Sequence, residues 1–156
     1  MKVLVPQDVS LRVSVTDRCQ LRCRYCMPTY GIALRSHDDI MRYEEIVTLV
    51  GELRRILPLT KVRLTGGEPL VRPGIEHLVS MLAALDIPDL ALTTNGQLLA
   101  GAAAQLKASG LVRVNISLDS LNERAYRKLS CGGDLNRTLE GIDEALRCGL
   151  SPVKLN

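Results

Sequence analysis

Three cysteines lie within eight residues of one another near the start of the chain. Cys19, Cys23 and Cys26 are separated by three and two residues, so their thiols can surround one metal centre from a single loop. A structural zinc site normally takes four ligands. The other candidate ligands lack zinc-finger spacing; they are His37, His77, Cys131 and Cys148. Because a [4Fe–4S] cluster is normally held by four thiolates, three would leave one iron open, and the spacing favours such a catalytic cluster over three merely buried cysteines.

The total number of cysteines, five, is odd and argues against a disulfide scaffold. The first seven residues contain no apolar signal core, and no apolar run approaches the roughly 20 residues that a membrane span requires. Clustered thiols without a secretion signal are typical of metal or redox chemistry in a reducing compartment. We therefore expect a cytoplasmic protein that does not enter a membrane.

Composition places the chain among globular proteins of about one domain. It has 156 residues, of which 46% are hydrophobic and 24% charged. There is no Trp or Phe and there are only four Tyr, so the core is aliphatic and no aromatic platform is available for stacking nucleic acid bases. The net charge of +3 is too small to indicate a polyanion partner by itself. We expect no nucleic acid partner.

Strand-like and helix-like segments alternate along the chain, which predicts an α/β fold with a parallel sheet of about five strands. The expected strands are residues 11–16, 61–65, 90–94, 112–117 and 152–156. The expected helices are residues 44–57, 74–85, 98–109 and 136–148, the last with Asn136 as its N-cap. The connection over residues 17–43 is long, and long ordered loops are often functional.

Several of the expected strands alternate between apolar and polar residues instead of being apolar throughout. The polar positions bring cations to one side of the sheet; they are Arg12, Ser14, Thr16, Lys61, Arg63, Thr65, Arg113, Asn115, Ser117, Lys154 and Asn156. A curled, barrel-like sheet with a wet cationic interior would satisfy this pattern and suit an anionic ligand. A face that simply meets solvent is an equally good interpretation of alternation alone.

Special turns follow the carboxyl ends of the strands, where parallel sheets and barrels gather their active sites. These turns begin at Asp17, Gly66, Asn95 and Asp119. Four such turns at one edge predict a site there.

The cysteine spacing, with Tyr25 before the last cysteine, resembles that of the radical S-adenosylmethionine (SAM) enzymes, and Gly66-Gly67-Glu68-Pro69 is similar to their SAM-binding motif. More specifically, the chain resembles the GTP 3′,8-cyclase family of molybdenum cofactor biosynthesis. The segments that carry this resemblance are LRVSVTDRC (11–19), YCMP (25–28), KVRLTGGEP (61–69), TTNG (93–96), VNISLDSL (114–121) and PVKLN (152–156). They are distributed over nearly the whole chain, from residue 11 to residue 156, in the right order.

The resemblance implies a TIM-type (β/α) barrel of the radical SAM type, of which residues 1–156 form the truncated N-terminal portion. It implies that Cys19, Cys23 and Cys26 hold a [4Fe–4S] cluster whose open iron binds the amino and carboxylate groups of SAM. The implied SAM contacts are Tyr25, Gly67, Glu68 and Ser117, with Glu68 at the methionine amino group. The implied GTP contacts are Arg12, Arg63, Thr93 and Lys154, three of which are also cations of the polar face.

The activity implied by the resemblance is that of a lyase. Reduction of the cluster by one electron would cleave SAM to methionine and a 5′-deoxyadenosyl radical, which would take a hydrogen atom from the ribose 3′-carbon of GTP. Attack of the sugar radical on C8 of guanine would lead to (8S)-3′,8-cyclo-7,8-dihydroguanosine 5′-triphosphate. The implied partners are GTP, a reductase or flavodoxin-type electron donor and a downstream cyclic pyranopterin monophosphate synthase, and the resemblance allows a homodimer.

The resemblance does not account for every feature of the chain. Members of the family are longer and carry a second [4Fe–4S] cluster in a C-terminal half, so we expect this chain alone to be inactive in GTP cyclisation. Cys131 and Cys148, expected in a loop and at a helix end, match no ligand of the family and are interpreted as packing residues. The alternatives are another radical SAM enzyme, an iron–sulfur or zinc module without catalysis, and a partner subunit that completes its barrel with another chain.

Overall fold

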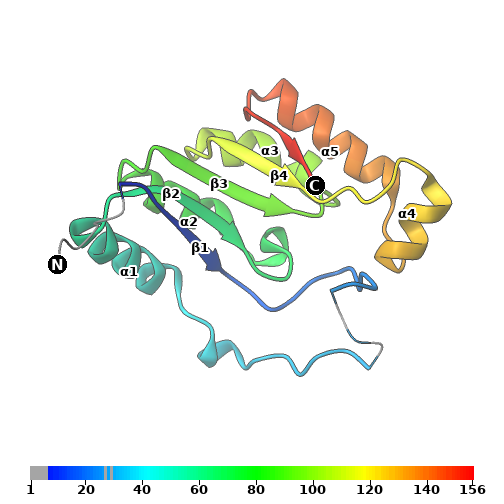
Figure 1. Ribbon diagram of the computed structural model, residues 1–156, viewed down its shortest axis with the longest axis horizontal. Helices are drawn as coiled ribbons and strands as arrows, with labels where there is room; N and C mark the ends of the chain where they lie inside the picture. Colours follow the sequence, from blue (N-terminus) through cyan, green and yellow to red (C-terminus); the bar gives the residue numbers. More distant parts are fainter. Residues whose placement is uncertain (1–6, 27, 29) are drawn as a thin grey trace.

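The computed structural model describes residues 7–26, 28 and 30–156. The predicted absence of a signal segment concerns residues 1–7, of which residues 1–6 lie outside the described residues, as does motif residue Met27. One parallel sheet forms the centre, with five strands in chain order (Figure 1). The strands are β1 (Val9–Ser14), β2 (Leu59–Thr65), β3 (Asp89–Thr94), β4 (Arg113–Ile116) and β5 (Lys154–Leu155). The predicted α/β fold is confirmed.

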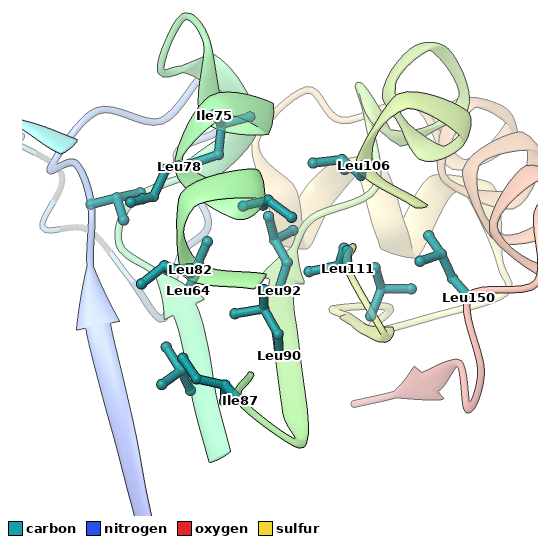
Figure 2. Close-up of a cluster of buried hydrophobic side chains, with 14 of the residues drawn as sticks. Leu64, Ile75, Leu78, Leu82, Ile87, Leu90, Leu92, Leu106, Leu111 and Leu150 are labelled. Carbon is teal, nitrogen blue, oxygen red and sulfur yellow. The ribbon is translucent and has the colours of Figure 1, made fainter. Parts of the chain in front are cut away.

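Four helices contribute to a core on one face of this sheet. They are α1 (Tyr43–Ile56), α2 (Ile75–Ala83), α3 (Leu99–Ala108) and α5 (Leu135–Arg147). Figure 2 shows Leu78 and Leu82 of α2 beside Leu64 and Leu92 of the strands, all four fully buried. Each such side chain contributes about 1.5–3 kcal/mol through burial. The aliphatic composition therefore suffices for this core, and no described helix is long and apolar enough to cross a bilayer.

Strand register arranges the predicted ligand residues on the opposite, polar face. Arg12 lies beside Arg63 on β1 and β2. Thr93 lies beside Asn115, which lies beside Lys154, across β3, β4 and β5. Parallel pairing therefore brings together side chains that are far apart in the sequence.

The polar face is less open and less cationic than the alternation predicts. Arg113 is buried, and its guanidinium donates from Nε and Nη2 to the two carboxylate oxygens of Asp89, at 2.8 and 2.9 Å. Lys61 Nζ lies 3.4 Å from the same carboxylate. Asp89 belongs to β3 but precedes the strand predicted over residues 90–94. The prediction therefore missed the acid that balances these two cations.

One helix was missed by the sequence prediction and one cap was assigned wrongly. Residues 123–130 form a further helix, α4 (Glu123–Ser130), capped by the Asn122 side chain, and Cys131 lies in the turn directly after it. The next helix, α5, is capped by Asp134 and not by Asn136. Asp134 has the extended backbone of an N-cap and accepts hydrogen bonds from the amides of Asn136 and Arg137, which already belong to the first turn.

Two short 3₁₀ helices complete the structure. They are η1 (His37–Asp39), within the long connection before α1, and η2 (Pro69–Val71), directly after β2. In Figure 1 the connection from β1 runs out beyond the sheet, and its first part reaches the end of α4.

Candidate active site

The loop that contains Cys19, Cys23 and Cys26, here called the cysteine loop, begins directly after β1. Backbone hydrogen bonds join it to the turn that follows β2. The amide of Gly67 donates to the carbonyl oxygen of Thr16 at 2.7 Å, and the amide of Glu68 donates to that of Arg18 at 2.8 Å. These bonds lie next to Cys19, so the turn after β2 positions the first of the three thiols.

The middle of the loop is joined to the C-terminal end of α4. The amides of Arg22 and Arg24 donate to the carbonyl oxygens of Ser130 (3.3 Å) and Leu129 (2.9 Å). The last carbonyl groups of a helix have no partner within the helix, and here the cysteine loop supplies one on each side of Cys23. A helix absent from the sequence prediction thus positions the second thiol.

The three thiols line one pocket. Cys19 and Cys23 are partly buried and Cys26 is exposed. Cys19 Sγ accepts weak hydrogen bonds from the amide of Leu21 (3.4 Å) and from Asn95 Nδ2 (3.7 Å). Burial raises the pKa of the Cys19 and Cys23 thiols above its ordinary value. Since thiols ligate metals as thiolates, binding a metal here would release protons.

Glycine is required where the turn after β2 meets the cysteine loop. A Cβ at Gly66 would lie 2.3 Å from the carbonyl oxygen of Thr16, and φ at Gly66 is +142°. A Cβ at Gly67 would lie 2.2 Å from the carbonyl oxygen of Arg18. Both contacts are with backbone, which cannot swing away as a side chain can, so the close approach of the two segments depends on these glycines.

The carboxylate of Glu68 joins the turn after β2 to the turn after β3. It is buried and accepts hydrogen bonds from Thr94 Oγ1 (2.7 Å), the amide of Asn95 (2.7 Å) and the amide of Leu70 (3.1 Å). Burial raises the pKa of Glu68, an effect that these hydrogen bonds oppose. The carboxylate oxygens are thus engaged within the protein, although Glu68 also lines the pocket.

Tyr25 and Asp119 connect the cysteine loop to the segment after β4. Tyr25 Oη donates to Asp119 Oδ2 at 2.7 Å, across the pocket wall that also contains Ser117. Burial and then this hydrogen bond raise the pKa of Tyr25 above its ordinary value. Tyr25 therefore acts as a neutral hydrogen-bond donor at physiological pH.

The structure brings eight of the eleven predicted site residues together around a pocket of about 210 Å³. They are Cys19, Cys23, Cys26, Tyr25, Gly67, Glu68, Thr93 and Ser117. The sequence prediction did not single out the other lining residues as ligands; they are Leu21, Thr65, Gly66, Thr94, Asn95, Asp119, Tyr126 and Ser130. Tyr126 and Ser130 belong to α4, and Asn122 three residues before Ala125 was the capping signal that could have indicated this helix.

The remaining predicted residues, Arg12, Arg63 and Lys154, do not line this pocket. Arg12 and Arg63 lie two positions before Ser14 and Thr65 on paired strands, about 6–7 Å toward the amino ends. None of the three cations forms an ion pair with another described residue. They remain available to an anion on the polar face, whereas Arg113 and Lys61 are engaged by Asp89.

The donor set fits an iron–sulfur cluster in its chemistry, because three thiols face one cavity from a single loop. Among residues 7–26, 28 and 30–156, no group of three cysteine, histidine or carboxylate side chains converges into a ready-made metal site. A cluster would therefore have to draw the three sulfur atoms together. The loop main chain, joined to the turn after β2 and to α4, would bring them close.

Comparison with protein families gives an independent result. The model of the radical SAM superfamily matches residues 13–156, which is most of the chain. The chain belongs to the radical SAM superfamily. The predicted resemblance is confirmed. The cysteine loop and the turn after β2 lie at the carboxyl edge of the sheet, where parallel sheets and barrels gather their active sites.

Two similar curated relatives of this radical SAM chain are GTP 3′,8-cyclases. A GTP 3′,8-cyclase of Alkaliphilus oremlandii (strain OhILAs) is 52% identical over 158 residues, which cover 100% of this chain and 49% of that protein. A GTP 3′,8-cyclase of Petrotoga mobilis (strain DSM 10674 / SJ95) is 51% identical over 147 residues, 94% of this chain and 45% of that protein. The chain thus spans about half the length of the curated relatives it matches.

Solved structures support the fold of the radical SAM core. The chain matches Streptococcus suis SuiB bound to S-adenosylmethionine with a TM-score of 0.71 and 19% identity, covering 97% of this chain and 32% of that one. It matches HydG, a maturase of the [FeFe]-hydrogenase, with a TM-score of 0.73 and 18% identity, covering 95% and 34%. The parallel sheet with its helices is therefore an open partial barrel of this type, as predicted.

Proposed function

We propose that this chain is the SAM-binding core of a GTP 3′,8-cyclase, a lyase of molybdenum cofactor biosynthesis. The observation that supports the proposal most strongly is the pocket that the cysteine loop and the strand-end turns form together. Its residues occur in a chain that is 52% identical to a GTP 3′,8-cyclase. GTP as substrate and the lyase reaction are taken from that likeness.

In this proposal, Cys19, Cys23 and Cys26 hold a [4Fe–4S] cluster, and Tyr25, Gly67 and Ser117 contact SAM. Together, the reduced cluster and bound SAM would supply a 5′-deoxyadenosyl radical. The contribution of Glu68 is proposed to be indirect, because its carboxylate already accepts three hydrogen bonds from the protein. Its role would be to keep two turns of the SAM pocket in register.

The triphosphate and sugar of GTP would bind along the polar face. Arg12 and Arg63 lie side by side, and Lys154 shares a register row with Thr93 through Asn115. Guanidinium and ammonium groups without an acidic partner suit phosphate oxygens. The protein would orient the ribose toward the cysteine pocket and keep water away, which is the usual contribution of a protein to cofactor chemistry.

The proposal also includes an electron donor of the reductase or flavodoxin type, a cyclic pyranopterin monophosphate synthase that consumes the product, and a cytoplasmic location. A second [4Fe–4S] cluster and a homodimer would involve residues or copies beyond this chain. Since the chain spans about half of its curated relatives, we propose that residues 1–156 alone cleave SAM without cyclising GTP.

Anaerobic reconstitution tests the proposal. The chain would be loaded with iron and sulfide, reduced with dithionite, and assayed for 5′-deoxyadenosine and for cyclised nucleotide in the presence of SAM and GTP. We expect 5′-deoxyadenosine from the unaltered chain and from Cys131→Ser, and none from Cys23→Ser. Zinc binding without iron uptake would identify a zinc module, and a fully loaded chain that leaves SAM intact would contradict SAM cleavage.

A further inference from the structure

A cluster of exposed charges lies where the cysteine loop meets the end of α4. Arg24 comes from the loop, and Arg124, Arg127, Lys128 and Glu123 come from α4; these five residues are called the α4 patch. Helix positions three and four apart are neighbours, so the cations of α4 share one exposed side. Four positive charges and one negative give the patch the same net charge as the whole chain, +3. The rest of the chain is therefore neutral overall.

The cations of the patch have no acidic partner among the described residues, unlike Arg55 and Arg147 on the longer helices. On α1, Arg55 Nη1 lies 3.3 Å from Glu52 Oε1. On α5, Arg147 Nη2 lies 2.5 Å from Glu144 Oε1. No such ion pair neutralises a cation of the α4 patch among the described residues.

The α4 patch is directly connected to the cysteines. The amide of Arg24 donates to the carbonyl oxygen of Leu129, the residue that follows Lys128. Arg24 is also the neighbour of Cys23, and Cys26 is exposed on the same loop. A macromolecule bound to the α4 patch would therefore lie beside the thiols that we propose as cluster ligands.

We propose that the α4 patch is the docking surface for an acidic, one-electron carrier of the flavodoxin type. This inference rests on the proposed function, because the cluster must receive one electron for each SAM molecule cleaved. The carrier would lose that electron and the cluster would gain it. Complementary charge speeds encounter and orients the partner, and such redox encounters use small, salt-sensitive interfaces. A nucleic acid fits less well, since the chain has no Trp or Phe on which bases could stack.

Binding to the cluster-free chain tests the surface independently of activity. A purified flavodoxin would be titrated with the unaltered chain, with R127E/K128E and with R55E/K107E, a control that makes the same charge change on exposed residues of α1 and α3. We expect R127E/K128E to weaken binding about tenfold or more and the control to change it less than twofold. R127Q/K128Q removes the two charges without reversing them. Its affinity for flavodoxin should fall too, but by less than that of R127E/K128E.

Reduction rates provide the second measurement. After reconstitution, R127E/K128E should be reduced about tenfold more slowly than the unaltered chain by reduced flavodoxin, but at the same rate by dithionite. If no cluster assembles, iron and sulfide analysis shows that the proposed function has failed, while the binding titration still tests the patch. Equal flavodoxin binding by R127E/K128E and R55E/K107E would overturn the proposal. So would equally tight binding of an RNA oligonucleotide.

Discussion

Glu68 illustrates how one side chain can organise a site without reacting in it. Its buried carboxylate receives hydrogen bonds from the turn after β3 and from its own turn, at 2.7 to 3.1 Å. A glutamine has one oxygen and one NH₂ group, so Glu68→Gln would place a donor against the amide of Asn95 or the hydroxyl of Thr94. Because an unsatisfied buried group costs about 1–3 kcal/mol, we expect the free energy of unfolding to fall by about 2 kcal/mol.

Urea unfolding of the 156-residue chain measures this loss. Glu52→Gln on α1 is the matched control, since Glu52 is exposed and should change the free energy of unfolding by less than about 0.5 kcal/mol. Equal midpoints for the two variants would contradict the bridging role of Glu68.

At Gly67 the structure depends on the absence of a side chain, whereas at Glu68 it depends on the side chain itself. A Cβ at this position would lie 2.2 Å from the carbonyl oxygen of Arg18, so Gly67→Ala has to push the two segments apart. We expect a loss of about 1–3 kcal/mol in the free energy of unfolding, as for other overpacked sites.

The control for this variant is Gly101→Ala on the exposed side of α3, where a Cβ meets nothing within 4 Å. Alanine favours a helix interior over glycine, so this variant should gain about 0.5–1 kcal/mol. Thermal unfolding of both variants checks that stability falls for Gly67→Ala and rises for Gly101→Ala. Losses of stability of similar size in both would show that the close approach at Gly67 is not the cause of its loss.

At the scale of elements, the start of α5 depends on Asp134. Its side chain accepts hydrogen bonds from the amides of Asn136 (2.9 Å) and Arg137 (3.4 Å). Removal of such a cap costs about 1 kcal/mol, so Asp134→Ala should lower the free energy of unfolding by about that amount. Asn136→Ala, inside the first turn, should have little effect. A larger loss for Asn136→Ala in urea unfolding would mean that the cap is assigned to the wrong residue.

The short helix α4 serves the site more than the core. It positions the cysteine loop through the carbonyl groups of Leu129 and Ser130, and it places Tyr126 in the pocket wall. Buried Tyr126 is itself held by a hydrogen bond to Thr138 Oγ1 of α5, at 2.8 Å. The last two helices thus connect the sheet to the cysteine loop.

At the scale of the whole molecule, Asp89 joins three strands through Arg113 and Lys61. Partial burial acts to raise the pKa of Asp89, but the hydrogen bonds and charges of Arg113 and Lys61 outweigh it and hold this pKa below its ordinary value. A carboxyl whose pKa is lower in the folded state stabilises the fold above the unfolded pKa of about 3.9. This stability is lost as the pH falls through the folded pKa.

We therefore expect the free energy of unfolding to decrease as the pH falls below about 4, and Asp89→Asn to reduce this dependence. At neutral pH, Asp89→Asn leaves buried Arg113 without its charge partner. The expected loss is about 2–3 kcal/mol, less than for a fully buried pair, because 27% of the Asp89 side chain is exposed. The free energy of unfolding would be measured from pH 3 to pH 7 for the unaltered chain and for Asp89→Asn. Parallel curves for the two proteins would contradict the proposed contribution of Asp89.

The sequence by itself determined the elements whose signals are local. Helical spacing identified α1, α2, α3 and most of α5, and the glycine and cysteine motifs identified the loop and turns of the pocket. Strand alternation also placed Arg12 and Arg63 on one face, because side chains of a strand point alternately to its two sides. Such patterns depend on neighbours a few residues apart, so they can be read without knowing the fold.

Only the tertiary structure decided which charges and backbone groups meet. Asp89 neutralises Arg113 from 24 residues away, and α4 holds a loop about 100 residues earlier in the chain. Arg113 and Lys61 therefore look like ligands in the sequence but are structural, whereas Arg24 and α4 look unremarkable but lie beside the thiols. The reason is physical: a hydrogen bond or ion pair depends on distance in space, which chain crossovers and strand register set, and not on separation along the chain.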